Sequence, residues 1–308
     1  MMHTGGLFHK YMINKFLDIN EQINLLKSRG LKITNAAAFD DFLLKNNYYR
    51  IKGYSLTLRN GDEFHSNVSE ESIYDIYNAD IEMRNIILLA TQFIEINAKS
   101  YFAYEFAKHF DSASSGGRTD FYNDASNYTF IKEDDEKTFS NRIDKISKRI
   151  KDQTPNELPL QHYAAKYSSI LPLWVYVEYM TMSDVSVLFN FLPETVKERI
   201  AQNFGVKKPR ILSNHLRCVS NLRNLCAHNY RLYNRHFITK PSLSKAQKDM
   251  IVGGNGSLFS YLLIIKQLMN NNDNYKLIFE RLKNLTNKYA KIDIKCYGFP
   301  DNWEECLK

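Results

Sequence analysis

The stretch NLRNLCAHNYRLYNR, residues 221–235, gathers the side chains of this chain that could do chemistry. Histidine is a residue type that can take up and release protons, so His228 is a candidate acid–base group. An arginine within a turn or two of His228 can bind a phosphate through two hydrogen bonds and stabilise charge in a transition state. Asn224, one helical turn before His228, can orient a ligand or the imidazole ring. These residue types are sufficient for cleavage of RNA without a metal ion.

The reaction that such a site supports depends on the 2′-hydroxyl group of RNA. This hydroxyl attacks the neighbouring phosphodiester and leaves a 2′,3′-cyclic phosphate, so DNA is not a substrate. Acid–base cleavage uses two proton-transfer groups, whereas the stretch contains one histidine. A symmetric dimer that places two stretches face to face would supply the second. From the spacing alone, passive anion binding and a merely solvated basic face remain open as alternatives.

One helix from Arg210 to Phe237, ended before Pro241, is expected to position these side chains. At about 100° per residue, one stripe of this helix carries only polar side chains spaced 4, 3, 4, 3 and 4 residues apart. Such a stripe of like charges without counter-ions favours an anionic partner. We expect RNA binding by this stripe and by three basic residues at the start of the helix. The stripe comprises Arg217, Asn221, Asn224, His228, Arg231 and Arg235, and the three basic residues are Lys207, Lys208 and Arg210.

Arg223 lies outside the stripe and is expected to face the apolar side of the helix, roughly 120° from the stripe centre. An unpaired charge there would be costly, so we expect a carboxylate partner. Two acids lie in apolar surroundings elsewhere in the sequence. Glu95, within TQFIEINAKSYF, is the first candidate, and Glu178, within LPLWVYVEYM, is the second.

The charge of the chain is concentrated in one segment. Residues Arg199 to Lys248 contain eleven Lys or Arg and no Asp or Glu, whereas the formal net charge of all 308 residues is only +7. A localised basic segment indicates a polyanionic partner. Nucleic acid is the commonest such partner, and an anionic membrane surface is the rival.

Composition and cysteine spacing indicate a soluble cytoplasmic protein. The four cysteines form no CxxC pair and no disulfide framework, which is typical of a reducing compartment. A zinc site is disfavoured because Cys226 and His228 point to different faces of the helix, and we expect no metal and no cofactor. Met1 to Lys10 lacks the apolar core of a signal peptide. The longest apolar run, Leu258 to Met269, is too short to span a membrane.

The remaining sequence predicts an all-α fold with little or no strand. A small N-terminal helical lobe, residues 1–56, is expected beside a helical body, residues 57–308, with one continuous domain as the alternative. The stretch 47–55, NYYRIKGYS, is predicted as a turn or short extended piece. Leu171 to Leu192 is predicted as a buried helix, a break near Ser183 and Asp184, and a second helix. Further helices are expected at 18–29, 35–46, 69–109, 130–151, 257–269 and 275–289.

These residues resemble a known family. Arg223 to His228 fits the R-[N/H/D]-x3-H signature of the HEPN superfamily of helical ribonucleases. Further stretches resemble the Abi (abortive-infection, AbiD/AbiF-like) branch of that superfamily, in order along residues 20 to 303. They are EQINLLKSRGLKI with NNYYRIKGY, FIEINAKSYFAYEFAKHF, LPLWVYVEYMTMSDVSVLFNFL, and CAHNYRLYNR with YGFPDNW.

The resemblance implies a HEPN-type helical bundle with additional N- and C-terminal helices, a homodimer that pairs two R-x4-H motifs, and RNA cleavage or RNA binding in phage defence. It also implies Arg223 and His228 as the catalytic pair, Asn224 as the polar residue after the arginine, and Glu95 as the supporting acid. Our leading hypothesis is a toxin-like endoribonuclease of abortive infection. The alternative is a non-catalytic protein that holds a small structured non-coding RNA on its basic face.

Overall fold

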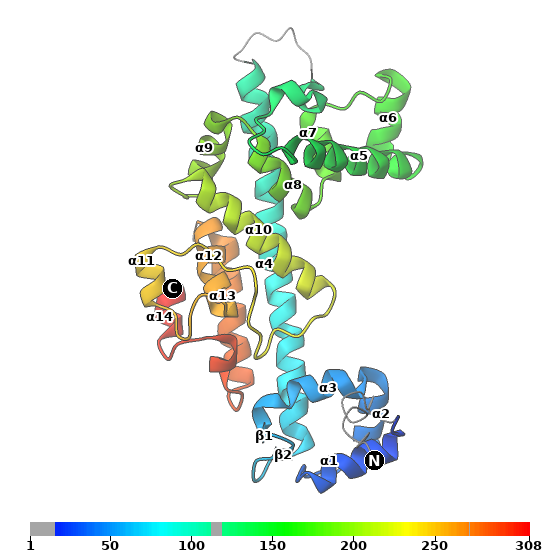
Figure 1. The fold of residues 1–308 in the computed structure, drawn as a ribbon, viewed down its shortest axis with the longest axis vertical. Helices are drawn as coiled ribbons and strands as arrows, with labels where there is room; N and C mark the ends of the chain where they lie inside the picture. Colours follow the sequence, from blue (N-terminus) through cyan, green and yellow to red (C-terminus); the bar gives the residue numbers. More distant parts are fainter. Residues whose placement is uncertain (1–15, 112–118, 271) are drawn as a thin grey trace, which may run out of the picture. The chain divides into compact units, whose positions relative to one another are not determined.

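The structure is a computed structural model that describes residues 16–111, 119–270 and 272–308 (Figure 1). The predicted all-α fold class is confirmed, since the described chain is mostly helical and its named strands form one small two-stranded sheet. The contacts divide the chain into two compact units, one ending at Ala79 and the other beginning at Asp80. The predicted lobe of residues 1–56 and body of residues 57–308 stay a prediction.

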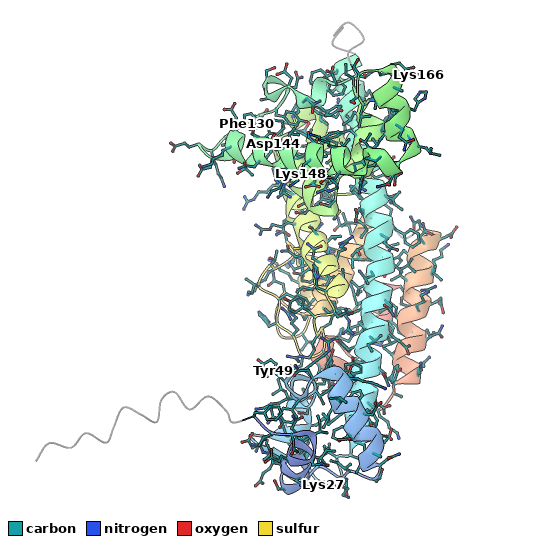
Figure 2. All side chains as sticks on the ribbon, turned by 90° about the vertical axis from the view of Figure 1, so that its right-hand side faces the viewer. Lys27, Tyr49, Phe130, Asp144, Lys148 and Lys166 are labelled. Atoms are coloured by element: carbon teal, nitrogen blue, oxygen red, sulfur yellow. The ribbon has the colours of Figure 1, made fainter. Side chains whose placement is uncertain are left out.

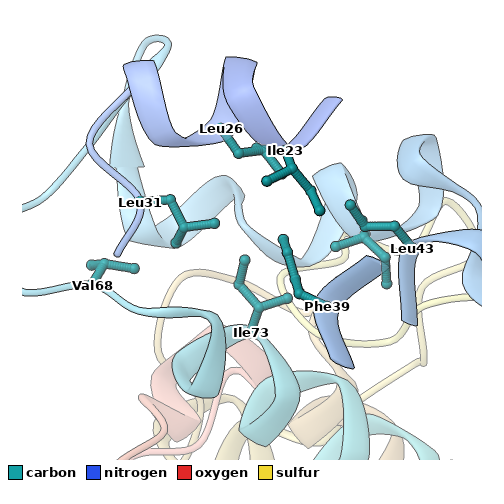
Figure 3. Close-up of a cluster of buried hydrophobic side chains, with 8 residues drawn as sticks. Ile23, Leu26, Leu31, Phe39, Leu43, Val68 and Ile73 are labelled. Carbon is teal, nitrogen blue, oxygen red and sulfur yellow. The ribbon is translucent and has the colours of Figure 1, made fainter. Parts of the chain in front are cut away.

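The first unit is built from short helices around a small apolar core. A capping box between Asp18 and Glu21 starts its first helix, and the Asn35 side chain caps the second. Figure 3 shows the core, in which Phe39 and Ile73 are fully buried among aliphatic side chains. The elements are α1 (Ile19–Ser28), α2 (Ala36–Asn46), α3 (Tyr48–Tyr54), η2 (Leu56–Leu58), β1 (Arg59–Asn60), β2 (Glu63–Phe64) and the start of α4.

Helix α3 corrects the prediction of a turn or extended piece at residues 47–55. Asn47 adopts a left-handed φ of 62°, and its side chain accepts a hydrogen bond from the Tyr49 amide. The chain can therefore reverse at one residue and start a new helix immediately. Ile51 and Tyr54 are buried, so tertiary packing outweighs the preference of aromatic residues for strands.

The second unit is organised along α4 (Glu70–Asp111), and α10 crosses this helix (Figure 1). Most helices expected in this region are confirmed, with shifted ends. None of the helices described is long and apolar enough to cross a membrane. The other elements are η3 (Phe121–Asn123), η4 (Ala125–Asn127), α5 (Asp135–Gln153), η5 (Thr154–Asn156), α6 (Leu158–Lys166), α7 (Leu173–Tyr176), η6 (Val177–Tyr179), α8 (Met182–Leu188), η7 (Phe189–Phe191), α9 (Glu194–Asn203), α10 (Pro209–Ala227), α11 (Lys245–Asp249), α12 (Leu258–Leu268), α13 (Asp273–Lys288), η8 (Ile294–Tyr297) and α14 (Trp303–Leu307).

The break predicted near Ser183 and Asp184 is present, but it lies slightly earlier, at Met180 and Thr181 just before α8. Thr181 and Asp184 form a capping box, which puts both predicted break residues inside the first turn of α8. Asp184 is buried and accepts hydrogen bonds from Arg142 and Arg149 of α5, at 3.0 and 2.9 Å. Burial raises the pKa of Asp184, but hydrogen bonds from Thr181 and the two arginines outweigh it and lower the pKa.

Candidate active site

Helix α10 ends at Ala227, and His228 is its C-cap residue. The prediction of one helix from Arg210 to Phe237 was therefore wrong at its C-terminal end. Asn229 adopts a left-handed φ of 57°, and its amide donates to the Cys226 carbonyl at 3.0 Å. The Tyr230 amide donates to the Leu225 carbonyl at 2.9 Å. This is the Schellman pattern with asparagine in the place that glycine usually takes, and it satisfies the last carbonyl groups of the helix.

The segment after α10 is fixed by a buried carboxylate of α4, that of Asp80. Its side chain accepts hydrogen bonds from the backbone amides of Leu232, at 3.1 Å, and Tyr233, at 2.8 Å. The Tyr297 hydroxyl donates to the same carboxylate at 3.1 Å, and Arg84 pairs with it at 2.5 Å. Asp80 and Arg84 are almost fully buried. The loop that carries His228 is thus tied to α4 by charged, buried contacts.

Sequence reasoning missed Asp80, although the sequence carried a signal for it. Ile73, Ile76, Met83 and Ile87 occupy the apolar stripe of α4, and Asp80 lies in the same stripe at the spacing of 4 and 3 residues. A carboxylate in such a stripe needs a partner. The same argument selected Glu95 from the sequence.

Arg223 lies between two polar partners at the C-terminal end of α10. Its Nε atom is 4.0 Å from Oε2 of Glu95, and its Nη1 donates to Oδ1 of Asn224 at 3.4 Å. The Arg223 side chain is 42% exposed and that of Glu95 16%. The guanidinium therefore lies at the edge of the helix packing, where a ligand can reach it. Glu95 also pairs with Lys99, at 3.6 Å.

The structure brings together part of the predicted polar stripe. Arg217, Asn221, Asn224 and His228 are exposed and share one face of α10. The Asn221 amide group donates to Thr239 Oγ1 at 2.9 Å, so this side chain is partly engaged within the chain. The backbone amide of His228 donates to the Asn224 carbonyl at 3.0 Å, which fixes the histidine backbone beside the asparagine.

Arg231 and Arg235 do not belong to this stripe, because the helix ends before them. Arg231 Nη1 donates to the carbonyls of Tyr233, at 2.5 Å, and Asn234, at 3.3 Å. The Arg235 guanidinium lies 5.6 Å from the centre of the Tyr230 ring and donates to the Arg231 carbonyl at 3.4 Å. Both arginines stabilise the loop after α10, and this contradicts their predicted place on a continuous helical stripe.

Three other basic residues lie at the opposite end of α10. Lys207, Lys208 and Arg210 are exposed around the helix start. By the rise of 1.5 Å per residue, Arg210 is about 27 Å from His228 along the helix. These cations and the residues at the helix end are therefore far apart, although Arg210 shares a helix with the site.

The cysteines of α10 are core residues. Cys218 and Cys226 are buried, and burial raises the pKa of both thiols to about 12. His215 is also buried and contacts the Ser242 carbonyl through Nε2 at 2.9 Å. At neutral pH the thiols are protonated, and they fill the interior beneath the polar face.

A family model of Abi-like proteins matches residues 41–234, which is more than half of the chain. The chain belongs to the Abi-like (abortive-infection) family. The residues that match the family model include α4, α10 and the loop fixed by Asp80, and they end at Asn234. Neither the curated proteins nor the solved structures contain a match to the chain.

Within one chain of this Abi-like protein, Arg223 and His228 occupy the same end of α10 but not the same face. The two residues are five positions apart, so at about 100° per residue their side chains leave the helix axis in directions about 140° apart. Arg223 faces α4 through Glu95, whereas His228 lies on the exposed polar face. A phosphate bound by His228 therefore has Asn224 as its nearest helical neighbour and meets Arg223 only around the edge of the helix.

Proposed function

We propose that this Abi-like protein is a metal-independent endoribonuclease whose site forms where two copies pair the ends of α10. The observation that carries the proposal is the placement of Arg223, Asn224 and His228 at one exposed helix end. That end lies within a segment of eleven cations and no acid. A polyanion is attracted to such a surface, and the imidazole of His228 is an exposed acid–base group at that helix end.

In the proposed reaction, His228 of one copy takes the proton from the 2′-hydroxyl, which attacks the adjacent phosphorus. His228 of the second copy gives a proton to the departing 5′-oxygen. The products are a 2′,3′-cyclic phosphate and a 5′-hydroxyl. Arg223, held between Glu95 and Asn224, stabilises the negative charge on the non-bridging oxygens.

The pairing of two copies would supply a second proton-transfer group of the same kind as His228. The other histidine of α10, His215, is buried and bonded to the Ser242 carbonyl, so it does not reach a ligand. Two copies related by a two-fold axis would place two His228 side chains and two Arg223 side chains about one phosphate. A homodimer in which each chain contributes to the site follows from this requirement.

A non-catalytic RNA-binding protein is the second candidate function. It is favoured by the divergence of Arg223 and His228 by about 140° within one chain. A protein that stays monomeric would hold RNA on the exposed cations of α10 without cutting it. In this second candidate function, the protein would bind a small structured RNA.

Incubation of RNA with the purified protein in the presence of a metal chelator separates these two functions. We expect the wild type to cleave RNA and His228→Ala to lose at least about a hundredfold in rate, since a positioned acid–base group contributes about this much. Salt-sensitive RNA binding should persist in the variant.

His162→Ala is the matched control, because His162 is an exposed histidine of α6 away from the motif. It should cleave at the wild-type rate. RNA binding without cleavage by the wild type would instead establish the non-catalytic function. Cleavage by His228→Ala at the wild-type rate would remove His228 from the mechanism.

A further inference from the structure

A groove runs beside the N-terminal half of α10, on the side that faces α8 and η7. Its volume is about 770 Å³. One wall is formed by α10, the other by η7 and the residues just before α5. The Ser213 hydroxyl donates to the Asn190 side chain across the floor. The groove therefore lies entirely within the second unit, between elements that are hydrogen-bonded to each other.

Three cations line this groove from two directions. Arg210 and Arg217 lie on the α10 wall, and Lys132 lies on the wall before α5. All three are exposed, and none forms an ion pair among the described residues. A fourth lining cation, Lys197, is paired with Glu194 at 2.8 Å. The groove thus presents three exposed cations without an ion pair among the described residues, and one of them, Lys132, also lies close enough to Asp135 to lower the pKa of that carboxyl.

The acid between these cations is already satisfied. Asp135 lines the groove at the start of α5, where its side chain accepts hydrogen bonds from the amides of Ile131 and Lys132, at 2.9 and 2.8 Å. These two backbone bonds lower the pKa of Asp135. The Asp135 carboxylate therefore stays ionised, and the three cations outnumber it in the groove.

The groove leads to the candidate active site along one face of α10. Arg210, Arg217, Asn224 and His228 lie on this face, with Asn214 and Asn221 between them, at spacings of 4, 3, 4, 3 and 4 residues. Arg210 and Arg217 are about 10 Å apart along the helix, and His228 follows about 16 Å further on. A chain of phosphates on the cations of the groove would therefore continue toward His228.

We propose that this groove binds the sugar–phosphate backbone of single-stranded RNA and directs the strand to His228. The proposal rests on the ribonuclease function inferred above and adds Lys132, from outside the basic segment, to the residues that hold the substrate. A space of about 770 Å³ is within the range that holds a small ligand, so it takes a short run of nucleotides and not a duplex. Contacts to phosphates alone make the binding independent of base sequence.

The test is the salt dependence of RNA binding by Lys132→Gln/Arg217→Gln, which removes one cation from each wall. Binding of a fluorescent single strand of about 16 nucleotides is measured in the His228→Ala background, so that the strand is not cut. The slope of log K against log salt should fall by about 1.4, since each phosphate contact on a single strand contributes about 0.7. A DNA strand of the same sequence should show the same change.

Lys145→Gln/Lys148→Gln is the matched control, because it removes the same charge from exposed positions of α5 that do not line the groove. Figure 2 labels Lys148 on this helix. The slope of this control variant should equal that of the parent. The slope could stay unchanged in Lys132→Gln/Arg217→Gln while protein with an intact His228 still binds and cuts RNA. This result would overturn the proposed role of the groove and leave the ribonuclease proposal standing. Absence of both RNA binding and cleavage in the wild type would overturn the ribonuclease function and the groove together.

Discussion

At the scale of single residues, the proposed chemistry depends on how three side chains are held at the end of α10. The His228 backbone is fixed by the Asn224 carbonyl, while its imidazole is exposed. Arg223 is held by Glu95 from α4 and by the Asn224 side chain. Asn224 therefore contacts both other residues, one through its backbone and one through its side chain. Glu95 sets the position of the guanidinium without facing the exposed polar stripe.

Glu95→Ala should lower the rate of RNA cleavage by about ten- to a hundredfold. The Arg223 guanidinium would lose its positioning partner, and a displacement of a catalytic group by about 1 Å lowers a reaction rate by this order. The free energy of unfolding should fall by only about 0.5 kcal/mol, because an ion pair with a half-exposed arginine contributes little. Cleavage rates and urea denaturation measure the two effects. Glu178→Ala, at an exposed acid that was the second candidate partner, should leave the cleavage rate unchanged.

The proximity of Arg223 and Glu95 could be predicted from the sequence because both residues violate a helical pattern. An arginine outside the polar stripe and an acid among apolar residues each need a partner. The same reasoning applies to Asp80 and would have identified it. The exposure of Arg223 could not be predicted in this way, because it depends on how closely α10 approaches α4.

At the scale of elements, the apolar spacing in the sequence does not predict where α10 ends. Tyr233 and Phe237 continue the apolar spacing of the helix and are buried, yet the chain leaves the helix at Asn229. The amides of Leu232 and Tyr233 bond to Asp80, about half the chain away in sequence. Such a long-range anchor outweighs local periodicity. Arg231 and Arg235 then stabilise the loop and do not extend the stripe.

Asp80→Asn should destabilise the protein by about 3 kcal/mol, because it leaves the buried Arg84 guanidinium without its charged partner. At temperatures where the variant remains folded, cleavage should also fall, since the loop after His228 loses its anchor. The midpoint of guanidinium denaturation reports the stability change. Asp273→Asn, which disrupts an exposed ion pair with Lys276, should leave the midpoint unchanged. Equal midpoints for both variants would contradict the anchoring role.

At the scale of the whole molecule, the all-α class could be predicted because helical periodicity extends over long segments such as α4 and α13. Short elements were harder, since α3 depends on the left-handed Asn47 and on packing within the first unit. The arrangement of the groove was not predictable, because its lining residues, such as Lys132 and Arg217, come from elements distant in sequence. The proposed site shared by two copies would make activity a property of the dimer.

Dilution of the protein tests the proposed shared site. Below the dissociation constant of the dimer, the specific cleavage activity should fall in proportion to protein concentration, because the active fraction is then set by dimer formation. Analytical ultracentrifugation over the same concentrations gives the dimer fraction for comparison. Specific activity that stays constant where the protein is monomeric would show that one chain suffices.

The most direct measurement is the rate of cleavage of an RNA oligonucleotide in a metal chelator, compared with the same strand carrying one 2′-deoxynucleotide at the mapped cut position. We predict that the wild-type protein cuts the RNA, leaves a 2′,3′-cyclic phosphate visible by mass spectrometry, and does not cut the substituted position. His228→Ala should cut neither strand. Cleavage at the 2′-deoxy position would contradict the proposed use of the RNA's own hydroxyl group, and with it the role assigned to His228.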